Sequence, residues 1–137
     1  MIVIDTHALV WLFEGDPQLG RKARQKIHEE RAGKGVYIPA VSIWETAMLV
    51  NKAKLVLSRS VREWFDAVLL SPGFHLAQIN VAIGIDAGSL PGNIHGDPAD
   101  RLIVATARSL GCSVLTVDRK ILDYAEEGHV QAINASL

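Results

Sequence analysis

The chain has 137 residues, of which 49% are apolar and 21% are charged, with a formal net charge of −1 and a single cysteine. This composition excludes a disordered chain and an internally disulfide-bonded scaffold, and the length suits one globular domain, residues 1–137, with a sizeable core. The near-neutral charge gives no sign by itself of a nucleic-acid-binding protein.

No apolar run approaches the ~20 residues that a membrane-spanning helix needs. The N-terminal stretch is interrupted by Asp5 and lacks a preceding basic region, so we do not expect a secretory signal. Cys112 lies in an apolar run and is expected to be an inert core thiol. We therefore expect a cytoplasmic protein with no membrane partner.

Apolar periodicity and chain breakers predict strands that alternate with helices along the whole chain. In chain order we predict strand 1–4, helices 7–13 and 18–31, strand 36–38, helices 42–53 and 60–70, strand 74–79, helix 80–88, loop 89–97, helix 98–110, strand 112–117, helix 119–125 and edge strand 130–133. This alternation predicts an α/β fold with a mostly parallel sheet and right-handed crossovers.

The segment from His95 to Leu110 organises the rest of the chain. Asp97 followed by Pro98 predicts a helix N-cap with proline at the first helical position. Asp100 falls in the first helical turn, where its charge suits the helix dipole. Apolar residues at helical spacing follow, so the segment holds a carboxylate at the mouth of a buried helix.

Three further acids lie at comparable points. Asp5 and Asp118 each end a predicted strand, and Glu45 lies near the start of a helix that follows another strand. Because sites in parallel sheets form beyond the carboxyl ends of the strands, we expect these acids to meet Asp100 at one edge.

Each acid also has a structural interpretation, since the aspartates suit helix starts. Glu45 lies three residues after Ser42, which predicts a capping box. Ser60 and Glu63 have the same spacing, and there we assign nothing more than a cap. Taken one at a time, each acid favours a structural role. Taken together, the four acids favour a functional site.

Four converging carboxylates need a compensating cation, because like charges raise one another's pKa. Oxygen ligands select hard cations, which points to Mg²⁺ with Mn²⁺ as a substitute. The five histidines are scattered, and none pairs at a spacing typical of zinc sites. A carboxylate-bound Mg²⁺ suits phosphoryl chemistry.

A polyanionic substrate would also need Lys and Arg near such a site. Segment 21–34 carries six of them against two acids, segment 51–62 carries four with no acid, and residues 63–100 carry none. A basic half that faces an acidic pocket and simple scattered charge both stay open on composition alone.

Four stretches carry a resemblance to a known family: MIVIDTHALVWLF at the start, VSIWETAML at 41–49, HGDPADRLIVATA at 95–107 and VLTVD at 114–118. In this order and spacing, over essentially the whole chain, they resemble the PIN-domain family, specifically the VapC-type toxins of bacterial toxin–antitoxin pairs. The resemblance implies a PIN-like, Rossmann-like three-layer sandwich with a sheet of about five parallel strands. It also implies Mg²⁺-dependent endonucleolytic cleavage of single-stranded RNA.

Matched residue by residue, the family's acidic quartet corresponds to Asp5, Glu45, Asp100 and Asp118. By resemblance, the three aspartates hold Mg²⁺ directly or through water, while Glu45 either completes the shell or orients the attacking water. In-line attack by that water leaves 5′-phosphate and 3′-hydroxyl ends.

The resemblance also implies supporting residues and partners. Asp97 matches a frequent fifth acid, which we interpret mainly as a helix cap, and Thr6 and Thr116 match hydroxyls that support the carboxylates. A small VapB-like antitoxin is expected to lie across the site, and the toxin is expected to form a homodimer. Arg101 suits a phosphate contact or a salt bridge to a neighbouring acid.

Other interpretations stay open on the sequence. A phosphoryl-receiver domain would need paired acids after the first strand, but Asp5 is followed by Thr6. A phosphatase with an aspartate nucleophile would need a second aspartate two residues after Asp5, where this chain has His7. An RNA- or protein-binding module on the same fold would bind without cleavage, although it has no need of four converging acids. Trp44 and Trp64 lie in apolar helical patterns, which predicts core or interface residues rather than RNA-stacking ones.

Overall fold

The computed structural model describes residues 1–94 and 96–137, so His95 in the predicted loop 89–97 lies outside the described residues. The described chain forms one five-stranded sheet in the order β3-β2-β1-β4-β5, and every neighbouring pair is parallel. The strands are β1 (Ile2–Ile4), β2 (Val36–Pro39), β3 (Phe74–Ala77), β4 (Ser113–Thr116) and β5 (Ala132–Asn134). The predicted α/β fold with a parallel sheet is confirmed.

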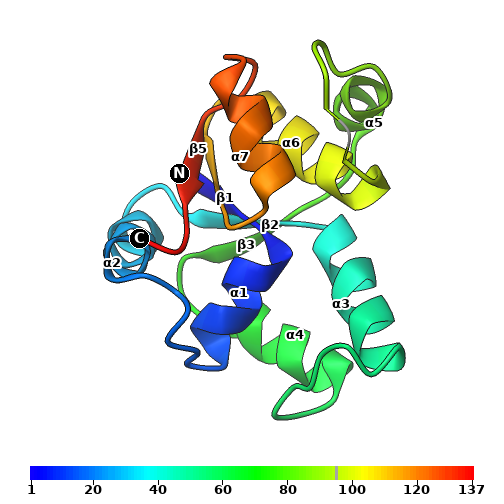
Figure 1. The fold of residues 1–137 in the computed structure, drawn as a ribbon. Helices are drawn as coiled ribbons and strands as arrows, with labels where there is room; N and C mark the ends of the chain where they lie inside the picture. The colour runs from blue at the N-terminus through cyan, green and yellow to red at the C-terminus, as the bar shows by residue number, and fades with distance from the viewer. Residues whose placement is uncertain (95) are drawn as a thin grey trace.

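Helices cover both faces of the sheet. They are α1 (Thr6–Phe13), α2 (Arg21–Ala32), α3 (Val41–Asn51), α4 (Val61–Leu70), α5 (Val81–Gly88), α6 (Pro98–Leu110) and α7 (Arg119–Glu126). Figure 1 shows α1, α2 and α4 on one side, α6 and α7 on the other, and α5 against α6 at the periphery. None of the helices in the described chain is both long and apolar enough to cross a membrane.

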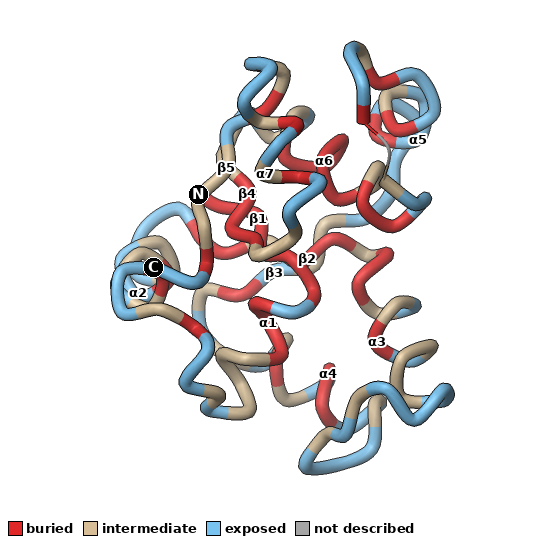
Figure 2. Tube along the Cα trace, in the orientation of Figure 1, coloured by how far each residue is buried: buried red, intermediate tan, exposed pale blue. Residues whose placement is uncertain are grey.

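The central strand, β1, is buried on both faces of the sheet, which explains its continuous apolar sequence. Ile2 and Ile4 pack into the core beneath α1, α2 and α4, whereas Val3 packs into the core beneath α6 and α7. Figure 2 shows this centre as buried and the loops at the periphery as exposed. The alternation follows from the two-residue period of a strand.

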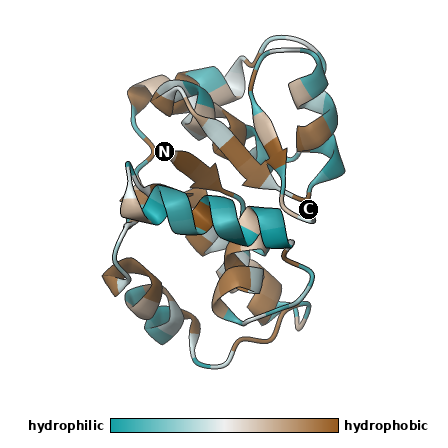
Figure 3. Cartoon of the chain, turned by 90° about the vertical axis from the view of Figure 1, so that its left-hand side faces the viewer, coloured by the Kyte–Doolittle hydropathy of each residue, from teal (hydrophilic) through white to brown (hydrophobic). Residues whose placement is uncertain are grey.

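Helix α2 lies at the surface, with its apolar residues turned toward the core and its polar residues turned outward. Leu19 just before the helix, and Ala23 and Ile27 within it, are buried, while most of the outward side is hydrophilic (Figure 3). The helix begins at Arg21 rather than at residue 18, and the main-chain N–H of Lys22 donates to the carbonyl oxygen of Leu137 at 2.9 Å. The other end of the chain therefore caps this helix, because Gly20 has no side chain to do so.

The order in which the parallel strands are added across the sheet reverses between β1 and β4. From β1 the chain continues to β2 and β3 on one side, whereas β4 and β5 lie on the other side of β1. The main-chain N–H of Asp5, just beyond β1, donates to the carbonyl oxygen of Leu115 in β4 at 2.9 Å. Such a reversal opens a crevice at the carboxyl ends of the two strands, where ligands of open α/β sheets bind.

Two of the tryptophan predictions have different outcomes. Trp64 is 3% exposed and packs edge-to-face against Phe13 and Phe65, as predicted for a core residue. Trp44 is 56% exposed, so of the two predicted alternatives the core position is wrong for this residue, and the interface position stays a prediction. It lies on the side of α3 away from Ser42 and Thr46, which are the buried polar residues of that helix.

Candidate functional site

Asp5 occupies the end of β1 and is almost fully buried. Its carboxylate accepts hydrogen bonds from the main-chain N–H of Thr6 at 2.6 Å and from the hydroxyl of Thr116 at 2.5 Å. Burial raises the pKa of Asp5 to about 6, although these two hydrogen bonds oppose the shift and the negative charge of Glu45 adds to it. The site therefore holds a carboxylate whose charge the protein compensates only in part.

Thr116 connects the two strand ends at the crevice. Its hydroxyl donates to Asp5 and accepts from the main-chain N–H of Asp118 at 2.9 Å. Asp118 in turn caps α7, because its carboxylate accepts from the main-chain N–H groups of Lys120 at 2.8 Å and Ile121 at 3.3 Å. One buried hydroxyl thus fixes the spacing of Asp5 and Asp118.

The start of α6 supplies two more acids. Asp97 is the N-cap, and its carboxylate accepts from the main-chain N–H of Asp100 at 3.0 Å, with Pro98 at the first helical position. Asp100 is 7% exposed. A Cβ atom at Gly96 would lie 2.7 Å from the Cβ atom of Asp100, so only glycine fits there without a shift.

Glu45 reaches the site from α3, but not by the predicted route. The N-cap of α3 is Ala40, so Ser42 lies inside the helix and the predicted capping box with Glu45 is wrong. Ser42 is instead fully buried and accepts a hydrogen bond from the hydroxyl of Thr6 at 2.9 Å. This bond ties α3 to the start of α1 and orients the helix that carries Glu45.

Ser42 is thus the residue that sequence reasoning did not assign to the site. The hydroxyl of Thr6 contacts Ser42 rather than a carboxylate, and Thr6 supports Asp5 through its main-chain N–H. A serine within an otherwise apolar helical stretch was the available signal, but the spacing to Glu45 pointed to a cap instead.

The electrostatics of Asp100 show which acids come together. Its pKa is raised to about 7, first by burial and then by the negative charges of Asp118, Asp97, Asp5 and Glu45. Acids from four separate parts of the chain therefore act on one carboxyl group at the crevice. Such mutual repulsion is relieved by protonation or by a bound cation.

Within residues 1–94 and 96–137, no three His, Cys, Asp or Glu side chains stand close enough to form a ready-made metal cage. The carboxylates of Asp5, Asp97 and Asp118 are instead engaged by hydrogen bonds at their own helix starts. The donor set nevertheless suits a hard divalent cation, since it consists of carboxylate oxygens whose repulsion such an ion would offset.

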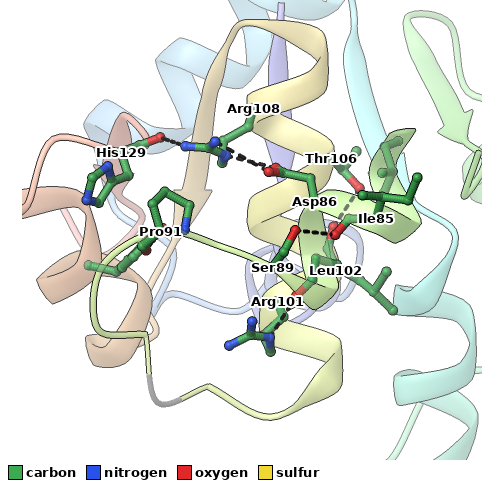
Figure 4. A network of polar contacts seen from close by, with 12 residues as sticks. Ile85, Asp86, Ser89, Pro91, Arg101, Leu102, Thr106, Arg108 and His129 are labelled. Atoms are coloured by element: carbon green, nitrogen blue, oxygen red, sulfur yellow. Dashed lines mark hydrogen bonds and ion pairs between the residues drawn. The ribbon is translucent and has the colours of Figure 1, made fainter. Parts of the chain in front are cut away.

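A separate polar network holds α5 against α6 (Figure 4). The guanidinium of Arg108 donates to the Asp86 carboxylate at 2.8 Å and to the carbonyl oxygen of His129 at 2.6 Å. Arg101 donates to the carbonyl oxygen of Ala87 at 2.8 Å, rather than to the neighbouring acids. These bonds anchor α5 to the helix that carries Asp100.

The chain is similar to known proteins over most of its length. The model of the PIN domain matches residues 2–127. Ribonuclease VapC22 of Mycobacterium tuberculosis is 31% identical over 120 residues, which cover 88% of both sequences.

Solved structures share the fold at lower sequence identity. FitAcB from Neisseria gonorrhoeae matches with a TM-score of 0.67 and 18% identity over 98% of both chains. A toxin–antitoxin complex from Klebsiella pneumoniae matches with a TM-score of 0.62 and 17% identity over 98% of both chains. The family match over most of the chain, the similar curated relative and the shared fold agree with the resemblance inferred from the sequence, and the chain belongs to the PIN domain family.

Proposed function

We propose that the protein is an endoribonuclease toxin of a toxin–antitoxin pair, built as one nuclease domain over residues 1–137. It hydrolyses phosphodiester bonds in single-stranded regions of RNA with Mg²⁺, for which Mn²⁺ can substitute. The observation that carries this proposal is the group of acids around Asp100, at the sheet edge where α/β proteins bind ligands. The similar mycobacterial protein is named a ribonuclease, which supports the same chemistry.

In this proposal Asp5, Asp100 and Asp118 hold the cation, directly or through water. When bound, a divalent cation lowers the pKa of water and neutralises charge on the leaving oxygen, which phosphodiester hydrolysis near neutral pH requires. Glu45, which is more exposed than Asp5 or Asp100, completes the ligand shell or orients the attacking water.

The remaining residues of the site act through these acids. Thr116 holds the carboxylate of Asp5 at 2.5 Å, and the main-chain N–H of Thr6 holds its other oxygen. Asp97 fixes the first turn of α6 and thereby positions Asp100. These contacts pre-position the acids, so that little rearrangement accompanies catalysis.

We propose a small VapB-like antitoxin as the inhibitory partner. A similar structure is titled a toxin–antitoxin complex, and another is titled FitAB bound to a DNA fragment, with 21% identity to this chain and a TM-score of 0.62. An inhibitor that places a basic side chain among the acids would relieve the repulsion around Asp100 much as a cation does.

We also propose a homodimer that uses the outward side of α5. Val81 and Ile85 lie one helical turn apart and are 78% and 66% exposed. Asp86, the charged residue of this helix, is paired with Arg108 at 2.8 Å. An apolar face without unpaired charge can pack on its own copy about a two-fold axis without like-charge repulsion. In sedimentation, Ile85→Glu should convert the dimer to a monomer, and a monomeric wild type would contradict the proposal.

The nuclease proposal is tested with purified protein, freed of any partner, and a mixed pool of structured RNAs with and without Mg²⁺. The Asp5→Asn, Asp118→Asn double variant is assayed alongside, and circular dichroism confirms that it is folded. We expect cleavage that requires Mg²⁺ and disappears in the double variant. RNA binding without metal and without cleavage would favour a non-catalytic binding module on the same fold.

A further inference from the structure

The three tryptophans of this chain differ sharply in their surroundings. Trp64 is buried among aromatic rings, and Trp11 is half-buried against the same core. Trp44 is 56% exposed and belongs to none of the core clusters of the described residues. A large aromatic ring left open to solvent is a common feature of a binding surface.

Trp44 is the immediate neighbour in α3 of Glu45, one of the acids of the candidate site. It precedes Glu45 in α3, and the charge of Glu45 acts on both Asp5 and Asp100, so Glu45 lies near the acids. Successive residues of a helix are turned by about 100°. Trp44 therefore lies one step around the helix from Glu45, and its side chain is turned away from the core and toward solvent.

Positive charge is available at the other end of the same helix. Lys52, Lys54 and Arg59 are all exposed, and the segment 51–62 that contains them has no acid. In the described part of the chain, none of these three side chains takes part in a salt bridge. Lys52 lies eight residues beyond Trp44, or about 12 Å along the helix axis.

The loop that carries these charges is fixed in place. The carboxylate of Glu14, just after α1, accepts hydrogen bonds from the main-chain N–H of Ser58 at 2.6 Å and from its hydroxyl at 3.0 Å. The exposed indole and Glu45 therefore lie near the N-terminal end of α3, and the fixed basic loop follows its C-terminal end.

On the basis of the proposed nuclease function, we propose that Trp44 is a base-stacking residue for single-stranded RNA. A nucleobase beside the scissile phosphate stacks on the indole, while phosphates of the same strand pass along Lys52, Lys54 and Arg59. Exposed aromatic rings combined with a positively charged track are how proteins bind single strands without reading their sequence. A paired RNA strand keeps its bases stacked within the duplex and would not offer this contact.

The test measures affinity and cleavage for wild type, Trp44→Ala and Trp44→Phe. Affinity is measured without divalent cations, using a short fluorescent single-stranded RNA, and kcat/KM is measured with Mg²⁺ on an RNA that wild type cleaves. Stacking contributes about 1–3 kcal/mol per base, so Trp44→Ala should weaken binding by roughly 5- to 150-fold. Trp44→Phe keeps an aromatic face and should stay within about threefold of wild type.

Leu70→Ala is the matched control, because Leu70 is 83% exposed and apolar but lies at the end of α4, outside the segment 51–62. It should change neither affinity nor cleavage. In addition, RNA should quench the tryptophan fluorescence of wild type more strongly than that of Trp44→Phe, and a duplex of the same sequence should quench neither.

Two results would overturn the stacking role. The first is wild-type affinity and cleavage in Trp44→Ala. The second is a change in sedimentation mass in Trp44→Ala that accounts for its weaker binding, which would make Trp44 an interface residue between copies. If wild type itself cleaves no RNA with Mg²⁺, the nuclease proposal fails, whereas cleavage by wild type with no effect of Trp44→Ala rejects only the stacking.

Discussion

Two aspartates, Asp86 of α5 and Asp100 in the first turn of α6, have opposite electrostatic surroundings. Asp86 faces Arg108 at 2.8 Å in a closed ion pair, whereas Asp100 is surrounded by the negative charges of Asp118, Asp97, Asp5 and Glu45. The first arrangement satisfies its charges within the protein. The second leaves negative charge that no group of the chain compensates. Such uncompensated charge is what a site for a cation and a polyanion needs.

The largest effect is expected from the acids themselves. Asp118→Asn should lower Mg²⁺-dependent RNA cleavage by about 10³-fold or more, since it removes several kcal/mol of transition-state stabilisation. Asp123→Asn in the same helix α7 is the control, because that side chain is 67% exposed, and it should leave the rate within about twofold. Equal rates for the two variants in a gel-based cleavage assay would show that Asp118 takes no part in catalysis.

The ion pair should matter for stability instead. Arg108→Met should lower the free energy of unfolding in urea by about 2 kcal/mol, because a part-buried carboxylate and a carbonyl oxygen lose their donor. Arg62→Met breaks an ion pair with Asp66 whose arginine side chain is 88% exposed, and it should cost no more than about 0.5 kcal/mol. If both variants cost the same, the Arg108 pair is no more than a surface contact.

The acid cluster should respond to pH in the opposite sense to a stabilising carboxylate. The pKa values of Asp5 and Asp100 are raised from 3.8 to about 6 and about 7, so the folded protein binds more protons than the unfolded chain between these values. Without metal, stability should therefore fall as the pH rises from about 4 to 7.

At pH 7.5 without divalent cations, Asp100→Asn should raise the free energy of unfolding by about 1 kcal/mol, because it removes the repulsion. Thermal melts of wild type and variant at pH 5 and 7.5 test both statements. A variant less stable than wild type at pH 7.5 would show that Asp100 is not held under repulsion. Added Mg²⁺ should reduce the difference by stabilising wild type more than the variant.

The smallest stability effect comes from two Ser-x-x-Glu sequences that look alike. Ser60 accepts from the main-chain N–H of Glu63 and donates to its carboxylate, so Glu63→Ala should cost about 0.5 kcal/mol and leave cleavage unchanged. Glu45→Ala should cost no stability and lower cleavage at least about tenfold. Matched urea titrations and cleavage assays compare the two, and identical behaviour would make Glu45 a cap after all.

This pair also shows what the sequence could and could not predict. The predicted strands, helices and sheet type follow from apolar runs and breakers, and the caps at Asp97, Asp118 and Ser60 were all identified correctly. The cap predicted at Ser42 was wrong, because α3 begins one residue earlier and Ser42 is bound to Thr6, 36 positions away in the chain. The spacing of residues within one helix cannot reveal a hydrogen-bond partner that lies so far away in the sequence.

The core alternative predicted for Trp44 failed for a related reason. A helical pattern counts tryptophan as apolar and assigns it to the core, but the direction of the core is set by what packs on the helix. In α3 that direction is marked by the buried polar residues Ser42 and Thr46. The sequence predicts acids at one edge of the sheet, whereas the strength of their effect on Asp100 depends on burial that only the folded chain defines.

The central claim is that the acids at the β1 and β4 ends form a site for a divalent cation. The most direct measurement is calorimetric titration of Mn²⁺ into partner-free wild type and into the Asp5→Asn, Asp118→Asn double variant, both shown to be folded. We expect saturable binding to wild type that is abolished in the double variant. Equal binding to the two proteins, or no binding to folded wild type, would contradict the claim that these acids hold a metal.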